Sequence, residues 1–199
     1  MSYVISYVGA GGKTGSIYRR AGELLAQGQR VVIATTTHMY VPGSDRGAFA
    51  DCAGKKEEEV LAEVKKVLDR DGICTVGVRL SREPEKFAAP GEALLEKVCR
   101  LADTALIEAD GAAHMAAKVP AEHEPAVAPF TDEVVIVMGL HAVGKTVLEA
   151  CHRAELVQEV LGCDGAHIVT REDLEVFMGE YEKKIRLQSP NIRIFRKYI

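Results

Sequence analysis

Six consecutive residues near the amino terminus, Gly9-Ala10-Gly11-Gly12-Lys13-Thr14, combine the residue types that bind a phosphate group. Glycines let the backbone adopt positive φ angles and turn its N–H groups toward an anion. Lys13 supplies a mobile cation for the β- and γ-phosphates of a nucleotide, and the Thr14 hydroxyl can bind Mg²⁺. The stretch predicts a short phosphate loop. The alternative is a glycine-rich turn that only joins a strand to a helix.

Two acidic residues, Glu108 and Asp110, follow the apolar run "TALI". Phosphate-loop enzymes keep a carboxylate at the end of a buried strand, where it orients Mg²⁺ or an attacking water. Either residue can serve, and an acidic turn that ends a strand is the alternative. We therefore expect Lys13, Glu108 and Asp110 to be catalytic, with Thr14, Glu108 and Asp110 as the metal ligands.

Polar residues also end the apolar run "RVVIAT", where Thr36, Thr37 and His38 can donate to a γ-phosphate or ligate a metal. Threonines at a strand end also suit β structure without any function, and a lone histidine is more often structural. We place these three residues beside the nucleotide.

The segment "KVPAEHEP" gathers charged side chains that can contact a metal, a second substrate or a client protein. We expect this loop to use Lys118, Glu122, His123 and Glu124. A solvated loop stiffened by proline is the alternative. Dedicated zinc binding is not favoured, because the loop has no cysteine and no helical pair of histidines.

A second stretch, "GLHAVGKT" (residues 139–146), fits the pattern G-x-x-x-x-G-K-[ST] letter for letter. A phosphate loop needs a later strand to carry the Mg²⁺ carboxylate, and only "AHIVT" follows Lys145 as a candidate. We therefore expect Gly9–Thr14 to be the phosphate loop. The second stretch should lie at the same edge of the sheet and contact substrate or client.

Strands and helices that alternate along the chain must position these residues. Apolar runs without alternation predict strands covered on both faces, at residues 3–8, 30–36, 73–78, 104–109, 133–138, 166–170 and 192–195. Stripes with a period near 3.6 predict helices at residues 14–27, 56–69, 91–102, 145–161 and 171–181. The order predicts an α/β three-layer sandwich with a mostly parallel sheet. At 199 residues, we expect one nucleotide-binding domain over 1–199.

Composition narrows the class of protein. A formal net charge of −4 gives no basic surface for nucleic acid. The 5 cysteines include no C-x-x-C pair, which favours reduced thiols in a cytoplasmic protein. No apolar stretch approaches the roughly 20 residues of a membrane span, and the amino terminus lacks the features of a signal peptide. The sequence gives no basis for predicting the oligomeric state.

Four segments, in this order, resemble the YqeC-like family of selenium-dependent hydroxylase accessory proteins: "VGAGGKT", "IATTTHM", "LIEADGAAHMAAKVPAEHEPAV" and "VVIVMGLHAVGKTVLEACHRAE". The resemblance spans roughly residues 3–175. It implies a phosphate-loop NTPase-like fold, a nucleotide (ATP or GTP) with Mg²⁺, and a role in maturing a selenium-dependent molybdenum hydroxylase. It points to the glycine loop, to residues 36–38, and to Glu108, Asp110, Lys118, His123 and Glu124.

This chain departs from the family pattern at two places. Gly144-Lys145-Thr146 stands where family members commonly have Gly-Lys-Pro, and "GEYEKKIRLQSPNIRIFRKYI" replaces an ending similar to Asn-Lys-x-Asp. The resemblance therefore does not imply guanine specificity for this chain. The leading hypothesis is an Mg²⁺-dependent NTPase. The alternatives are a non-catalytic carrier of a phosphorylated cofactor such as molybdopterin, and an ATP-dependent ligase or kinase, because Mur-type peptide ligases use a similar G-x-x-G-K-T loop.

Overall fold

The chain divides into two compact units in the computed structural model, which describes residues 2–199. The first unit comprises residues 2–6, Thr14–Ala109 and Ala128–Asp132. The second unit comprises Tyr7–Lys13, Asp110–Val127 and Glu133–Ile199. Strand β1 (Tyr3–Gly9) thus contributes its first residues to one unit and its last residues to the other. The single domain over 1–199 stays a prediction.

The first unit is built on a mostly parallel sheet. Its strands lie in the order β1, β7 (Thr104–Glu108), β2 (Val31–Thr35) and β5 (Ile73–Arg79). Strand β4 (Ala48–Asp51) pairs in parallel with β5, whereas β6 (Lys86–Ala88) and β3 (His38–Tyr40) extend the sheet antiparallel. Every residue of β2 and β7 is buried, as expected for strands covered on both faces.

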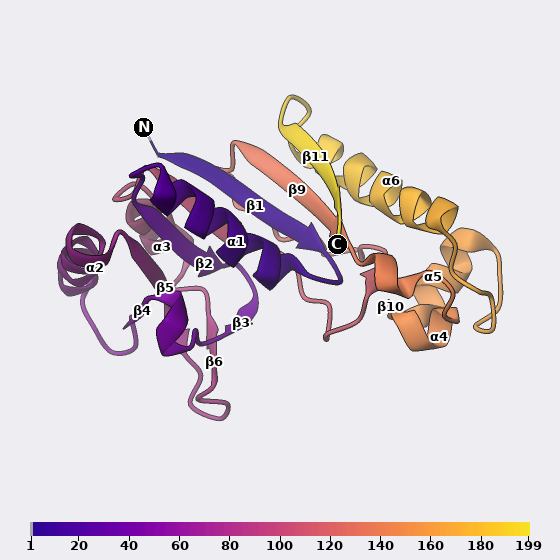
Figure 1. Ribbon diagram of the computed structural model, residues 1–199, viewed down its shortest axis with the longest axis horizontal. Coiled ribbons are helices and arrows are strands. Elements are labelled where there is room, and N and C mark those ends of the chain that lie inside the picture. The colour runs from indigo at the N-terminus through magenta and orange to yellow at the C-terminus, as the bar shows by residue number, and fades with distance from the viewer. Residues whose placement is uncertain (1) are drawn as a thin grey trace. The chain divides into compact units, whose positions relative to one another are not determined.

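Helices cover both faces of this sheet. The connection through α1 (Lys13–Ala26) runs across the sheet from β1 to β2, whereas α2 (Glu57–Asp71) and α3 (Glu92–Cys99) lead back toward β7. Because such crossovers are right-handed, α2 and α3 lie on the face opposite to α1. Figure 1 shows α1 in front of the strands and α3 behind them, and α2 contacts α3. A short 3₁₀ turn, η1 (Ser44–Arg46), precedes β4.

The second unit places one long helix against a parallel pair of strands. Strand β11 (Arg193–Tyr198) pairs in parallel with β9 (Glu133–Met138), and β1 is the next strand. Helix α6 (Arg171–Gln188) packs on β9 through a buried stripe of Leu174, Phe177, Met178, Tyr181 and Ile185. These positions recur every three or four residues, which puts them on one helix face.

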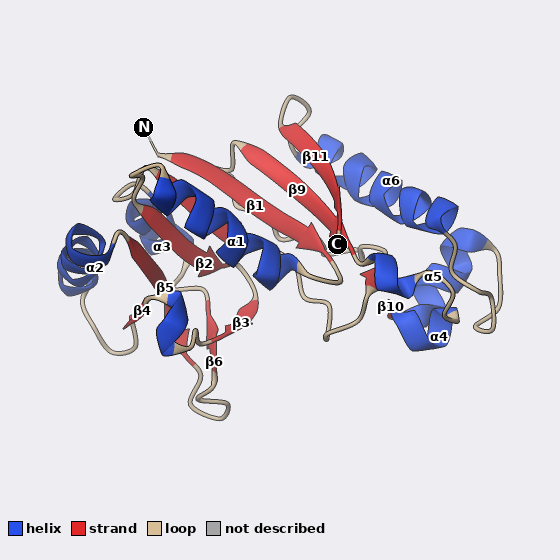
Figure 2. Ribbon diagram, in the orientation of Figure 1, coloured by secondary structure: helices blue, strands red, loops and turns tan. Residues whose placement is uncertain are grey.

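Shorter elements complete the second unit, and Figure 2 distinguishes its helices from its strands. Strands β8 (Ala117–Lys118) and β10 (Cys151–His152) form a parallel pair. The remaining elements are η2 (Leu140–Ala142), α4 (Val147–Ala150) and α5 (Ala154–Leu161).

The predicted mixed α/β fold with a largely parallel sheet is confirmed, and the likeness to phosphate-loop NTPases stays a prediction. Strands β3, β4, β6 and β8 were not predicted, and two predicted elements are not found as predicted. Residues 166–170 do not form a strand, because Ile168 makes only an isolated bridge to Thr146. The helix predicted over 145–161 is divided into α4 and α5 by β10, and Arg153 before α5 has a left-handed φ of 53°. None of the helices within residues 2–199 has the length and apolar character needed to cross a bilayer.

Candidate functional site

The glycines of the predicted phosphate loop adopt backbone conformations that other residues disfavour. The φ angles of Gly9, Gly11 and Gly12 are +92°, +73° and +135°. A Cβ atom at Gly9 would lie 2.2 Å from the carbonyl oxygen of Val137, and one at Gly11 would lie 2.3 Å from that of Ala116. The loop therefore needs glycine both for its φ angles and for its close approach to neighbouring backbone.

The loop leaves backbone donors available at the start of α1. The Gly9 N–H donates to Asp110 Oδ2 at 3.0 Å, and the Ala10 N–H donates to the Val137 carbonyl at 2.9 Å. The N–H groups of Gly11 and Gly12 donate to no other group within residues 2–199. Free N–H groups beside a helix amino terminus can bind an anion.

Lys13 and Thr14 follow directly in the chain as the first residues of α1. The Lys13 side chain is buried, and its Nζ donates to the Gly9 carbonyl at 2.8 Å. The Thr14 hydroxyl donates to Glu108 Oε2 at 2.7 Å. Hydroxyl and carboxylate oxygens are the ligands that Mg²⁺ prefers.

The carboxyl ends of β7 and β2 are joined through the backbone of Glu108. The Thr35 hydroxyl donates to the Glu108 carbonyl at 2.7 Å, and the Thr36 N–H donates to the same oxygen at 3.1 Å. The Thr37 N–H donates to Thr35 Oγ1 at 2.9 Å. The turn after β2 is thus fixed against the residue that contacts Thr14.

The three residues predicted beside the nucleotide differ in accessibility. Thr36 and Thr37 are half-buried, whereas His38 is exposed. His38 begins β3, where it lies opposite Ala88 of β6. Thr36 is therefore held at the end of β2, and His38 belongs to the antiparallel extension of the sheet.

Asp110 lies in the second unit, where both of its carboxylate oxygens are occupied. Oδ2 accepts from the Gly9 N–H and from the Tyr181 hydroxyl, and Oδ1 accepts from Lys118 Nζ at 2.8 Å. Asp110, Lys118 and Tyr181 are all fully buried. Burial raises the pKa of Tyr181, and the adjacent Asp110 charge raises it further, so the phenol keeps its proton.

Glu124 continues this cluster toward the surface. Its Oε2 accepts from Lys118 Nζ at 2.7 Å, from Arg153 at 2.7 Å and from the Ala121 N–H at 3.0 Å. Burial alone would raise the pKa of Glu124, but these hydrogen bonds outweigh it and lower the pKa to about 2. The third donor of Lys118 binds the Gly111 carbonyl at 2.6 Å. We call Asp110, Lys118, Glu124, Arg153 and Tyr181 the Asp110 cluster.

The four residues predicted to contact a substrate or client thus separate into two pairs. Lys118 and Glu124 form a buried ion pair, whereas Glu122 and His123 are exposed. Only Glu122 and His123 are accessible to a partner from this set.

The stretch 139–146 lies beside the glycine loop but has a different local structure. A Cβ atom at Gly11 would lie 2.6 Å from Gly139 Cα. Thr146 caps the four-residue helix α4, because its hydroxyl accepts from the Glu149 N–H at 3.3 Å. Lys145 is exposed. The stretch is therefore a neighbour of the glycine loop, with its threonine engaged as a helix cap.

The family model for the YqeC protein matches residues 5–155. The chain belongs to the YqeC family. A relative from Escherichia coli (strain K12), named "Uncharacterized protein YqeC", is 35% identical over 161 residues, which make up 80% of this chain and 60% of the relative. The chain therefore spans about 60% of the length of that relative.

Three residues of this YqeC-family chain were not predicted from its sequence to contact the site. Thr35 is the buried last residue of β2, and Arg153 and Tyr181 belong to the Asp110 cluster. Tyr181 lies on the apolar stripe of α6, where the sequence pattern predicts only a core residue. A tyrosine hydroxyl in such a stripe needs a hydrogen-bond partner, and this need was the available signal.

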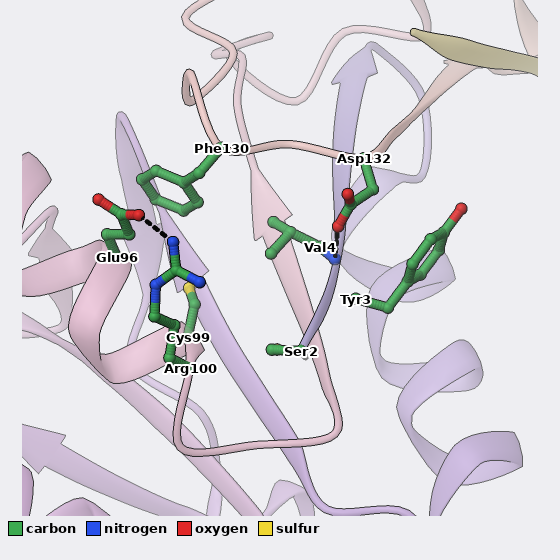
Figure 3. A pocket seen from close by; sticks show the side chains of 8 residues that line it. All are labelled: Ser2, Tyr3, Val4, Glu96, Cys99, Arg100, Phe130 and Asp132. Carbon is green, nitrogen blue, oxygen red and sulfur yellow. Dashed lines mark hydrogen bonds and ion pairs between the residues drawn. The ribbon is translucent and has the colours of Figure 1, made fainter.

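One cavity of the YqeC-family protein lies away from these residues, in the first unit. It has a volume of about 430 Å³, and it lies between the start of β1, the end of α3 and the segment around Phe130. Figure 3 shows Arg100 paired with Glu96 at its edge and Asp132 bound to the Val4 N–H. None of the predicted site residues lines it. Among residues 2–199, no three His, Cys, Asp or Glu side chains gather in a way that could hold a metal ion.

Proposed function

We propose that this YqeC-family protein binds an Mg²⁺–nucleotide, ATP or GTP, at residues 9–14 and hydrolyses it. The observation that carries the proposal is the 2.7 Å hydrogen bond between the Thr14 hydroxyl and Glu108. It pairs the residue that ends the glycine loop with the carboxylate that ends β7. A hydroxyl and a carboxylate in this relation are the two protein groups that hold Mg²⁺ in phosphate-loop enzymes.

The surrounding residues fit a bound phosphate. The unpaired N–H groups of Gly11 and Gly12 and the amino terminus of α1 would bind phosphate oxygens. Lys13, whose ammonium now binds the Gly9 carbonyl, would exchange that contact for the β- and γ-phosphates. Thr14 and Glu108 would hold Mg²⁺, which supplies positive charge against the charge that develops on the phosphate oxygens. The contacts favour Glu108 over Asp110 as the metal ligand, because Asp110 already accepts three hydrogen bonds.

We further propose that the protein acts as a maturation factor for a selenium-dependent molybdenum hydroxylase in the cytoplasm. The resemblance of four segments of the chain to the selenium-dependent hydroxylase accessory proteins supports this role. The exposed Glu122 and His123 would face the client enzyme or its cofactor, since the buried Lys118 and Glu124 cannot. All 5 cysteines are free thiols, which fits a reducing compartment because disulfides form and persist in oxidising ones.

Replacing the two lysines of the competing glycine stretches separates their roles. We expect Lys13→Ala to abolish binding of ATP and GTP in isothermal titration calorimetry with Mg²⁺. Lys145→Ala should retain most of the affinity, because Lys145 is exposed beside a helix cap. Circular dichroism of both variants controls for folding.

The opposite pattern, with loss only in Lys145→Ala, would move the phosphate site to residues 139–146. Absence of binding by the unchanged protein at millimolar ATP and GTP would refute the proposed function. Release of inorganic phosphate over time distinguishes an NTPase from a carrier. Binding of a pterin phosphate without turnover of either nucleotide would favour the carrier.

A further inference from the structure

We infer that the Asp110 cluster is a positioning device that sets the conformation of the glycine loop, whose residues 9–13 belong to the same unit. Asp110 accepts a hydrogen bond from the loop, donated by the Gly9 N–H at 3.0 Å. The inference rests on the proposed function, because it assigns the cluster a part in nucleotide binding at that loop. It makes Asp110 a positioning residue and leaves Glu108 as the carboxylate that would hold the metal.

The charged groups at the centre of the cluster have hydrogen-bond partners. Lys118 Nζ uses its three donors on Asp110, Glu124 and the Gly111 carbonyl at 2.8, 2.7 and 2.6 Å. A buried ammonium with its three acceptors in place is held in one position, since any movement would leave a charge without a partner. The Asp110 carboxylate is fixed in turn and cannot turn toward a metal without losing these contacts.

Fixing Asp110 fixes the start of the loop. Gly9 is the last residue of β1, and its φ of +92° begins the turn that exposes the N–H groups of Gly11 and Gly12. The Ala10 N–H is bound to Val137, so the loop is anchored at two successive amides. A loop held in its binding conformation before the ligand arrives binds with a smaller loss of conformational entropy.

Tyr181 connects this anchor to a distant part of the chain. It is fully buried on α6, and its hydroxyl donates to the same Asp110 oxygen that accepts from Gly9. Arg153, the most exposed member of the cluster, contacts Glu124 from the turn before α5. Residues far downstream in the chain therefore act on the geometry of the glycine loop through Asp110.

Tyr181→Phe tests the inference because it removes one hydroxyl and keeps the aromatic ring. Tyr198→Phe is the matched control, since the Tyr198 hydroxyl also donates to a carboxylate of the second unit, that of Glu175. Two quantities are measured in each variant: hydrogen exchange of the Gly9 amide relative to the amides of β9, and the dissociation constant for Mg²⁺–ATP. We expect Tyr181→Phe to speed Gly9 exchange and weaken binding by about tenfold each, the equivalent of about 1.4 kcal/mol. Tyr198→Phe should change neither quantity.

The exchange measurement needs no ligand, so failure of the inference and failure of the proposed function remain distinguishable. Equal Gly9 exchange in the two variants overturns the inference whether or not ATP binds. Faster exchange with unchanged affinity also overturns it. Faster exchange in a protein that binds no nucleotide refutes the proposed function and leaves the control of the loop by the cluster standing. In the unchanged protein, Gly9 must exchange as slowly as β9; exchange as fast as that of Gly12 would contradict the inference without any variant.

Discussion

At the scale of single residues, Gly11 offers a direct test of the loop geometry. Its φ of +73° and the 2.3 Å approach to the Ala116 carbonyl leave no room for a Cβ atom. We expect Gly11→Ala to lower the free energy of unfolding by about 2–4 kcal/mol, from left-handed strain and overpacking together. Urea unfolding monitored by circular dichroism measures this change.

Gly22→Ala is the matched control within the following helix. Gly22 lies inside α1, and a Cβ atom there would meet nothing within 4 Å. Alanine should therefore raise the free energy of unfolding by up to ~1 kcal/mol, because it favours the helix more than glycine does. Equal effects of the two substitutions would show that the loop does not have the conformation described.

The sequence was sufficient to predict a glycine-rich turn at residues 9–12, but not which groups hold it. Phosphate binding by this turn stays a prediction. Three glycines followed by Lys13 and Thr14 indicate an anion-binding turn from their own chemistry. The hydrogen bond from Tyr181 to Asp110 could not be predicted in this way, because the two residues are 71 positions apart in the sequence. Pairing over that separation depends on how α6 packs, and the local pattern of α6 predicts only a buried helix face.

At the scale of secondary-structure elements, Thr146 shows why a motif can match and still serve another purpose. Its hydroxyl caps α4 in a reciprocal arrangement with Glu149, whose carboxylate accepts from the Thr146 N–H at 3.0 Å. We expect Thr146→Ala to cost about 1 kcal/mol of stability, the usual value for a lost cap. Nucleotide affinity should stay unchanged, as measured by calorimetry.

Thr14→Ala provides the comparison, since the proposal gives its hydroxyl to Mg²⁺. That variant should lose the gain in ATP affinity that Mg²⁺ provides, whereas Thr146→Ala should keep it. If Thr146→Ala lost the Mg²⁺ effect instead, the metal would belong to Thr146, and the assignment to Thr14 would be wrong.

Most elements could be predicted because burial on both faces leaves an unbroken apolar run, as in β2 and β7. The elements that could not be predicted are those in which a local feature interrupts the pattern. Residues 145–161 have helical periodicity, but the chain pairs Cys151 and His152 with β8 before the helix resumes. Arg153 then takes a left-handed conformation, which no periodicity signals.

At the scale of the whole molecule, the Asp110 cluster should make the free energy of unfolding depend on pH in the acid range. The pKa of Glu124 is about 2 in the folded state, against 4.5 for the free side chain. Between these values the unfolded chain binds more protons than the folded one, so the free energy of unfolding falls as the pH falls. The contribution of the Glu124 carboxylate to the free energy of unfolding is fully present above about pH 4.5, and roughly 3 kcal/mol of it is lost by pH 2.

Urea unfolding at pH values from 6 down to 2 measures this loss, and two glutamine variants identify its source. Glu124→Gln should be less stable near neutral pH, because Lys118 loses one of its two carboxylates. Its stability should also fall less steeply below pH 4.5, since the group with the lowered pKa is gone. Glu122→Gln, at an exposed position two residues earlier, should keep the slope of the unchanged protein. If all three proteins lost stability in parallel between pH 4.5 and 2, the acid dependence would have to come from other carboxylates. Asp173 is one of these, because hydrogen bonds from His167 and Thr170 outweigh the effect of burial and lower its pKa.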